Sequence, residues 1–285
     1  RRFHRVITGI HLIYVFLILL SVALACLLLL VPADQIPRPL VLAAIPVAAY
    51  AILSGLMQLT RGKPFFVAHL VDDTAFTHAH AKGETPEMEA RLDAFAREIR
   101  AAEGRSSEIV VIGHSSSSFF GFEALDRVLA ADPDFGRRRT PVSFVTIGSV
   151  IPWITLDANA DKTRAALVRV AAAPAIAWLD IRTKWDWLSI YKRDPLSGSG
   201  LPSPKEHRPI ELYVRMPDFV EARTLFRRRF NLFQMHFQLL MSSYSPHTFD
   251  YVSFVTGPEP IPVLIQRWRR LKAQPLGRVK EVDGW

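Results

Sequence analysis

The first sixty residues consist of two long apolar runs separated by a short polar interruption. Residues 10–31 and 40–59 are almost entirely apolar, and the Pro-rich stretch 32–39 between them holds Asp34 and Arg38. Each run is close to the roughly 20 residues that a helix needs to cross a bilayer. Two adjacent runs of this kind are rare in soluble cores, so residues 1–60 are predicted to form a two-helix transmembrane hairpin.

Basic residues flank the predicted hairpin on both sides. Arg1, Arg2 and Arg5 precede the first apolar run, and Arg61 and Lys63 follow the second. Because cytoplasmic flanks of membrane spans are enriched in Lys and Arg, we expect both ends of the hairpin in the cytoplasm. Residues 61–285 are then expected on the cytoplasmic side of the membrane.

After residue 61 the pattern changes to short apolar runs that alternate with helix-like periodicity. Apolar, β-branched runs predict strands at 65–71, 108–112, 142–147, 175–181 and 210–214. Helical spacing predicts helices at 85–99, 119–131, 161–173 and 218–241, and the Pro/Gly/Ser-rich residues 194–209 predict a long loop. Alternating strands and helices favour an α/β fold with a mostly parallel sheet flanked by helices.

Composition excludes several classes of protein. Apolar residues make up 49% and charged residues 22% of the 285, which excludes a dominantly disordered chain, and one cysteine excludes a disulfide framework. The net charge of +8 suits nucleic acid, an anionic membrane face or a basic surface. The basic runs at 137–139, 227–229 and 267–270 are short and scattered, and no nucleic-acid-binding signature accompanies them. We therefore expect no nucleic acid partner, and basic side chains that face solvent or lipid headgroups.

A strand that runs directly into a serine-rich turn and a helix is the sharpest chemical signal. The apolar run ends at Ile112, and the chain continues with Gly113-His114-Ser115-Ser116-Ser117. This order resembles the nucleophile elbow of the α/β-hydrolase superfamily, whose pattern is Gly-x-Ser-x-Gly. Gly113 supplies the small residue that lets strand and helix pass closely, but Ser117 stands where the family usually has glycine. The alternative interpretation is a serine-rich helix cap.

The resemblance implies a catalytic triad in the chain order serine, acid, histidine. Ser115 is the expected nucleophile, and the backbone N–H of Ser116 at the helix N-terminus is the expected oxyanion donor. For the acid we favour Asp186, which follows a predicted strand, over Asp180, which falls inside it. The candidate bases are His236, His247 and His207. His236 is favoured because it lies in a stretch similar to one in lipase-like bacterial membrane proteins, while His247 lies in a turn and His207 in the Pro-rich loop.

Histidines and carboxylates also gather before the first predicted helix of the domain, at His69, Asp72, Asp73, His78 and His80. Residues 78–83 superficially match a His-x-His-x-Asp-His metal motif, but Lys82 replaces the aspartate and Gly83 the last histidine. Because a cation repels a metal ion, we expect no metal site and no cofactor. Residues 69–74 would form the loop after the first strand, which supplies the second oxyanion donor in the family, and no residue there is assigned that role.

The resemblance implies a membrane-anchored serine hydrolase that cleaves a carboxylic ester through an acyl-enzyme. It also implies a protein of a bacterial inner (plasma) membrane, with residues 61–285 as an α/β-hydrolase-like catalytic domain that faces the cytoplasm. Because a bilayer is the expected partner, an apolar, lipid-like ester is the expected substrate. The alternative is a non-catalytic, membrane-anchored scaffold or interaction module that keeps the hydrolase fold, since fold does not imply function. Ser117 and the unassigned oxyanion donor favour that alternative.

Overall fold

The structure is a computed structural model that describes residues 2–32, 35–60, 66–138, 140–202, 209–242, 250–264 and 266. The chain divides into two compact units, Arg1–Ala75 and Phe76–Trp285. The division falls inside one helix, α3 (Val67–Ala81). The expected domain boundary after residue 60 stays a prediction.

The N-terminal unit is built on two apolar helices that pack against each other. Helix α1 (Arg2–Ala25) continues into a 3₁₀ turn, η1 (Cys26–Leu30), and α2 (Arg38–Thr60) follows. The Arg38 guanidinium donates a hydrogen bond of 2.7 Å to the backbone oxygen of Leu29, which links η1 to the start of α2. The stretches Thr8–Leu30 and Arg38–Leu59 are long and apolar enough to span a membrane, judged by length and composition.

Helix α3 replaces the strand that the sequence predicted at residues 65–71. Its buried positions Val67, Leu70, Thr77 and Ala81 recur at the helical period of about 3.6 residues. The strand prediction was wrong because an apolar run of this length does not by itself distinguish a strand from a buried helical segment. Residues 69–74 are consequently helical and form no loop that could offer a backbone oxyanion donor.

The second unit is organised around a four-stranded parallel sheet in the order β1-β2-β3-β4. Its strands are β1 (Ile109–His114), β2 (Val142–Ile147), β3 (Ile176–Arg182) and β4 (Ile210–Tyr213). The register pairs His114 with Ile147 and Ile147 with Ile181, so the first three strands end level at their carboxyl ends. The strands predicted in these four regions are confirmed, with boundaries shifted by a few residues.

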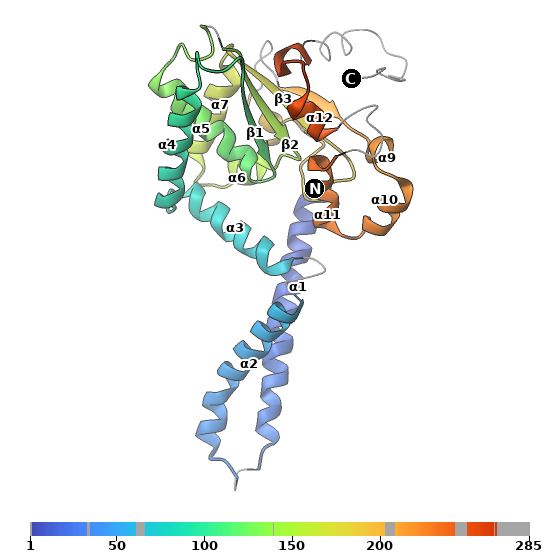
Figure 1. Cartoon of the computed structure of the whole chain (residues 1–285). Helices are drawn as coiled ribbons and strands as arrows, with labels where there is room; N and C mark the ends of the chain where they lie inside the picture. The colour runs from blue at the N-terminus through green and yellow to red at the C-terminus, as the bar shows by residue number, and fades with distance from the viewer. Residues whose placement is uncertain are drawn as a thin grey trace. The chain divides into compact units, whose positions relative to one another are not determined.

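Three helices cover one face of this sheet: α4 (Pro86–Ala101), α5 (Ser117–Ala131) and α7 (Asp161–Ala172) (Figure 1). Right-handed crossovers between parallel strands taken in sequence order place the connecting helices on the same face. Leu92, Leu125 and Leu167 are fully buried in this layer. The buried positions of α4 are Leu92 and Ala96, and Phe95 beside them is 48% exposed.

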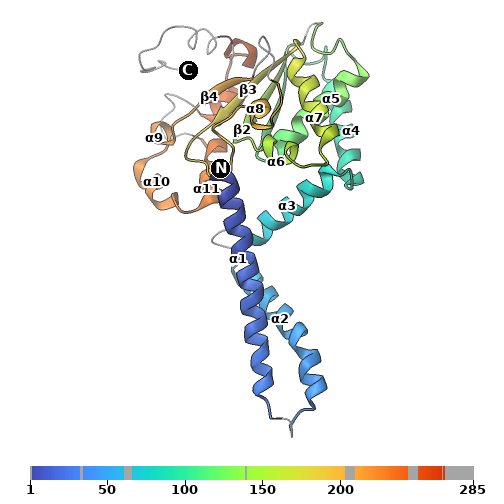
Figure 2. The same ribbon diagram turned by 180° about the vertical axis from the view of Figure 1, so that it is seen from behind.

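The opposite face is covered by the C-terminal helices, as the view from behind also shows (Figure 2). Leu179 and Ile181 of β3 pack there with Met235, Leu239 and Phe254. The helix predicted at 218–241 is divided into several pieces, so that prediction was wrong in its continuity. One break falls at Asn231, whose side chain accepts a hydrogen bond of 3.0 Å from the Gln234 N–H and starts a new helix. The helices of this layer are α9 (Met216–Phe219), α10 (Ala222–Arg228), α11 (Leu232–Phe237), η2 (Gln238–Leu240) and α12 (Tyr251–Thr256).

Two further short helices lie in connections. Helix α6 (Ile151–Thr155) follows β2, and α8 (Pro195–Gly198) interrupts the predicted loop at 194–209. Asp194 caps α8 by accepting hydrogen bonds from the backbone N–H groups of Leu196 and Ser197. The described part of the second unit is thus an α/β sandwich with helices on both faces of a parallel sheet.

Candidate functional site

The connection between β1 and α5 is a two-residue turn with a strained serine. Strand β1 ends at His114 and α5 begins at Ser117, so Ser115 and Ser116 make the whole turn. Ser115 has a φ of +57°, which costs a non-glycine residue about 1 kcal/mol or more. Its N–H donates a hydrogen bond of 3.2 Å to the backbone oxygen of Ile147 in the neighbouring strand, which fixes the turn against the sheet.

The residues that flank Ser115 explain how the tight turn is accommodated. A Cβ atom on Gly113 would lie 2.5 Å from the backbone oxygen of Ser117 and 2.6 Å from Cα of Ser118, so strand and helix touch at this position. The turn accommodates Ser117 at the position of the expected glycine, because the Ser117 side chain folds back onto the backbone of His114. The Ser117 hydroxyl donates to the His114 backbone oxygen at 2.6 Å and accepts from the His114 N–H at 2.8 Å.

Asp186 and His236 form a buried pair although they come from separate segments. Asp186 lies in the loop after β3 and is 0% exposed, and His236 lies on α11 and is 2% exposed. Asp186 Oδ2 is 2.7 Å from His236 Nδ1, and Asp186 Oδ1 accepts a hydrogen bond of 2.9 Å from the Leu188 N–H. His236 Nε2 is buried and has no hydrogen-bond partner within the described part of the chain. The carboxylate therefore orients the ring through Nδ1 and leaves Nε2 available.

Two observations place the His236 ring near the serine turn. The rings of His114 and His236 have centroids 4.3 Å apart. A Cβ atom on Gly148, which follows the Ile147 that binds the Ser115 N–H, would lie 3.3 Å from His236 Cε1 and 2.8 Å from Asp186 Oδ2. The turn, Gly148 and the loop of Asp186 follow β1, β2 and β3, and the carboxyl ends of strands are where open α/β sheets bind ligands.

His114 and Gly148 are neighbours of the pair that the sequence did not single out. Gly148 has a φ of +56° and donates its N–H to the backbone oxygen of Ile181 at 3.0 Å, so it joins the ends of two strands. In the sequence, Gly148 could have been found as a glycine that directly follows a buried strand. His114 could have been found as a histidine next to the serine of the turn.

The His114 side chain is held neutral. Its Nε2 lies 3.2 Å from the backbone oxygen of His236, and because that oxygen only accepts, His114 Nε2 carries the proton and donates it. Burial, and then the proximity of His236, lower the pKa of His114 to about 4, while the Asp186 carboxylate opposes this shift. A neutral His114 binds the main chain of α11 without adding a positive charge beside the His236 ring.

Asp180, the alternative acid, contacts two neighbouring side chains inside the sheet. Asp180 lies in the middle of the sheet in β3, where Thr146 donates a hydrogen bond of 2.5 Å to it and Arg182 forms an ion pair with it. Both of its oxygens are thereby engaged within the core. His207 and His247, the alternatives to His236, lie outside the described residues.

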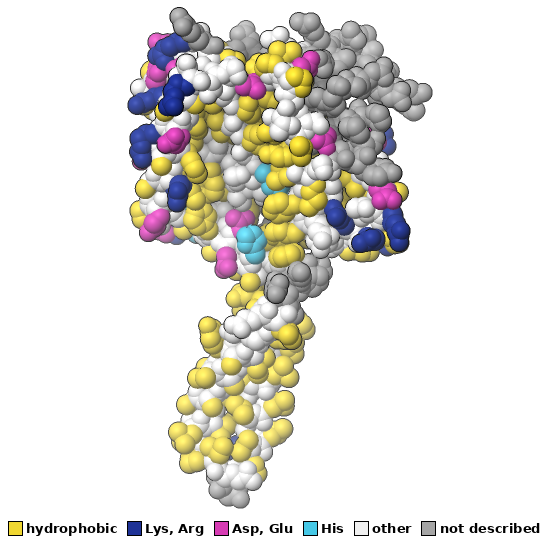
Figure 3. All heavy atoms as spheres, in the orientation of Figure 1, with side chains coloured by type: hydrophobic (Ala, Val, Ile, Leu, Met, Phe, Trp, Pro, Cys, Tyr) yellow, Lys and Arg dark blue, Asp and Glu magenta, His cyan; other side chains and the backbone are white. Residues whose placement is uncertain are grey.

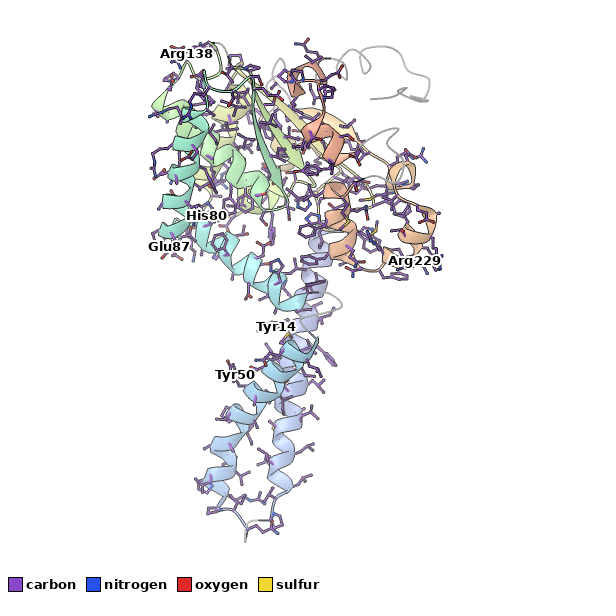
Figure 4. The ribbon with its side chains drawn as sticks, in the orientation of Figure 1. Tyr14, Tyr50, His80, Glu87, Arg138 and Arg229 are labelled. Atoms are coloured by element: carbon purple, nitrogen blue, oxygen red, sulfur yellow. The ribbon has the colours of Figure 1, made fainter. Side chains whose placement is uncertain are left out.

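Two histidines of α3, His78 and His80, have separate hydrogen-bond partners. His78 Nδ1 is 2.6 Å from Asp157 Oδ2. His80 is buried, with Nδ1 2.6 Å from Thr85 Oγ1 and Nε2 2.8 Å from Glu123 Oε2 (His80 is labelled in Figure 4). Among the residues that the structure describes, no group of three or more His, Cys, Asp or Glu is arranged to hold a metal ion.

Ser116 is the N-cap of α5, with φ of −60° and ψ of −30°. Its assignment as oxyanion donor stays a prediction.

No family model, no curated protein and no solved structure matches this chain. The candidate site therefore has to be judged on its own geometry.

Proposed function

We propose that this chain is a membrane-anchored serine hydrolase that cleaves a carboxylic ester through an acyl-enzyme at an α/β-hydrolase-like site. The observation that carries the proposal is the buried Asp186–His236 hydrogen bond, which leaves His236 Nε2 unpartnered among the described residues, beside a serine with a φ of +57°. A base oriented by a carboxylate next to a serine on a strained strand-to-helix turn is the arrangement that activates a hydroxyl nucleophile.

In the first half of the reaction, Ser115 Oγ attacks the ester carbonyl carbon while His236 Nε2 takes the hydroxyl proton. The carbonyl oxygen becomes a tetrahedral oxyanion, which accepts a hydrogen bond from the Ser116 N–H. Asp186 stabilises the imidazolium of His236, and a neutral His114 places no second positive charge beside it. The intermediate then collapses, the C–O bond to the alcohol breaks, and His236 returns its proton to the leaving alkoxide.

In the second half, water attacks the acyl-enzyme. His236 Nε2 accepts one proton of the water, a second oxyanion forms, and the bond to Ser115 Oγ breaks. The proton on His236 passes to Ser115, which releases the carboxylic acid and restores the enzyme.

The substrate class follows from the tether. The apolar stretches Thr8–Leu30 and Arg38–Leu59 are suited to a bilayer, and an enzyme fixed there meets apolar esters at high local concentration. We propose a lipid-like ester as substrate, with the second unit on the cytoplasmic side of a bacterial plasma membrane.

Ester hydrolysis by the purified full-length protein tests the proposal. Ser115→Ala and His236→Ala are each expected to lower turnover of an apolar ester by about 10⁴-fold or more. Ser106→Ala is the matched control, because Ser106 is an exposed serine before β1, and it should keep full activity. Unchanged thermal unfolding would show that each variant is folded.

The outcomes separate the candidate functions. Full activity in Ser115→Ala would contradict the proposed nucleophile. Full activity in His236→Ala alone would transfer the role of base to another histidine, of which His247 is the first to test. A folded wild-type protein that hydrolyses no ester would instead favour the non-catalytic scaffold.

A further inference from the structure

The helices that carry His236 also present an unusual surface. From residue 222 to residue 241 the chain contains four arginines and four phenylalanines, and no aspartate or glutamate. The phenylalanines are Phe226, Phe230, Phe233 and Phe237. Because a surface segment of a soluble unit normally mixes charges of both signs, this composition is unusual for solvent exposure alone.

The segment formed by α10, α11 and η2 has both buried apolar residues and exposed aromatic ones. Leu225, Met235 and Leu239 belong to the hydrophobic core that packs on β2 and β3. On the other side, Phe226 is 66% exposed, Phe230 is 75% exposed and Phe237 is 42% exposed. Large apolar side chains that are this exposed and clustered usually mark an interaction site.

Arginines are interleaved with these rings. The Arg229 guanidinium lies 3.5 Å from the centroid of the Phe226 ring and 4.8 Å from that of Phe230. Figure 4 shows Arg229 at the outer edge of the unit, beside α10, and Figure 3 shows Lys/Arg and hydrophobic side chains next to each other over α10 and α11. We call Phe226, Arg227, Arg229, Phe230 and Phe237 the α10–α11 surface.

The arginines of this surface form no ion pairs within the described part of the chain, unlike those of another arginine run. Arg227 and Arg229 are exposed and form no ion pair with any described residue. Arg138, in the run at 137–139, is instead engaged by Asp132 and Glu103 at 2.8 and 2.6 Å. The basic run at 267–270 lies outside the described residues. The positive charge of the α10–α11 surface is therefore available to an external anion.

We propose that the α10–α11 surface docks onto an anionic bilayer, with Phe226 and Phe230 in the acyl boundary and Arg227 and Arg229 on lipid phosphates. Exposed aromatic side chains beside arginines are what the headgroup region of a bilayer accommodates, since rings enter the apolar boundary while cations stay with the anionic headgroups. The two apolar helices of the same chain make a bilayer the surface that is always at hand. A tethered unit needs only weak affinity to stay docked, because the tether sets a high effective concentration.

Docking here would connect the bilayer to the candidate site. The Phe237 ring lies 5.0 Å from the His114 ring, and Phe237 directly follows His236 on α11. Phe237 thus links the α10–α11 surface to the two histidines of the candidate site. This consequence rests on the proposed hydrolase activity, whereas the docking rests only on the membrane anchor of the proposed function.

Lipid-dependent quenching in full-length protein tests the proposal without measuring activity. The single cysteine is first removed by Cys26→Ala. A new cysteine is then introduced by Phe230→Cys or, as the matched control, by Phe95→Cys, and a nitrobenzoxadiazole label is attached to it. Phe95 is an exposed phenylalanine on α4, in the helix layer on the other face of the sheet. Each protein is reconstituted into vesicles of phosphatidylcholine alone or with about 30 mol% phosphatidylglycerol, with acyl-brominated lipid as quencher.

In the anionic vesicles we expect the label at position 230 to be quenched at least about threefold more than the label at 95, with emission shifted to the blue. Arg227→Glu with Arg229→Glu should reduce this quenching to the level of the control, while the double exchange to lysine should retain it. Equal quenching at positions 230 and 95 would overturn the proposal. Equal quenching at position 230 in both lipid mixtures would overturn the role of the arginines. The same label is also measured in native membranes, and a label that is shielded there but quenched in neither vesicle mixture would overturn the proposal in favour of a protein partner. None of these results depends on ester hydrolysis.

Discussion

Replacing Asp186 with asparagine perturbs the proposed triad at one atom. Asparagine keeps the shape of the side chain, and its oxygen still accepts the hydrogen bond from the Leu188 N–H. Its amide nitrogen takes the place of Oδ2, 2.7 Å from His236 Nδ1, and this nitrogen only donates. His236 Nδ1 must then accept, so the ring proton moves to Nε2, the atom that has to receive the proton of Ser115.

The magnitude follows from this change of tautomer. The same exchange in a Ser-His-Asp triad lowers kcat by about 10⁴, which is about 5.5 kcal/mol of transition-state stabilisation at 1.36 kcal/mol per factor of ten. Folding is affected much less, because the number of hydrogen bonds around the buried side chain is kept and a typical one contributes about 1 kcal/mol. We therefore expect activity to collapse while the fold persists.

The measurement is kcat/KM for an apolar ester together with the thermal unfolding midpoint of each variant. Asp134→Asn is the matched control, because Asp134 is exposed in the turn before β2, and it should change neither quantity. If Asp186→Asn kept activity within about tenfold of the wild type, the argument that Asp186 sets the His236 tautomer would be refuted.

Three further predictions concern the residues around the pair. Gly113→Ala should destabilise the second unit by about 2 kcal/mol or more, because its Cβ would meet backbone atoms of Ser117 and Ser118; an unchanged Tm would contradict the close approach. Gly148→Ala should lower turnover more than stability, since its Cβ would press on Asp186 Oδ2 and its φ of +56° disfavours a side chain; comparison of kcat with Tm checks this. His114 has a folded pKa of about 4 against an ordinary 6.5, so its contribution to stability is present above pH 6.5 and is lost as the pH falls toward 4, to a maximum of about 3 kcal/mol. His114→Gln should flatten the fall in Tm over that window, and an equally steep fall in the variant would show that another group is responsible.

The elements of the sheet could be predicted because their signal is local. The strand at Val142–Ile147 is buried at all six positions, as expected of a parallel strand covered on both faces, and its β-branched and aromatic residues are interrupted only by Ser143 and Thr146. The serine turn was predictable for the same reason, since Gly113 and the small residues after it follow such a run directly. The apolar length of α1 and α2 likewise indicated two helices able to span a membrane.

The errors and omissions arose where tertiary contacts decide the outcome. The run at 65–71 carries no local feature that separates strand from helix, and the burial of Leu70 and Thr77 along one helical face is visible only in the structure. The break at Asn231 depends on its side chain capping α11 instead of facing solvent.

In the candidate site, too, local features could be predicted from the sequence and tertiary contacts could not. The preference for Asp186 over Asp180 followed from where each residue stands relative to β3, which is a local property. The hydrogen bond of Asp186 to His236 joins residues 50 positions apart, so sequence order alone suggested it without fixing it. The support that His114 gives to α11 joins residues 122 positions apart and had no signal beyond the residue type.

Covalent labelling by a fluorophosphonate tests the central claim most directly, because only an activated hydroxyl reacts at an appreciable rate. Full-length protein is incubated with the probe, digested, and the modified peptide is mapped by mass spectrometry. We predict one adduct, on Ser115, that is absent from Ser115→Ala and slowed severely in Asp186→Asn. A folded protein that stays unlabelled, or an adduct on another serine, would contradict the proposal that Ser115 is the nucleophile of a hydrolase.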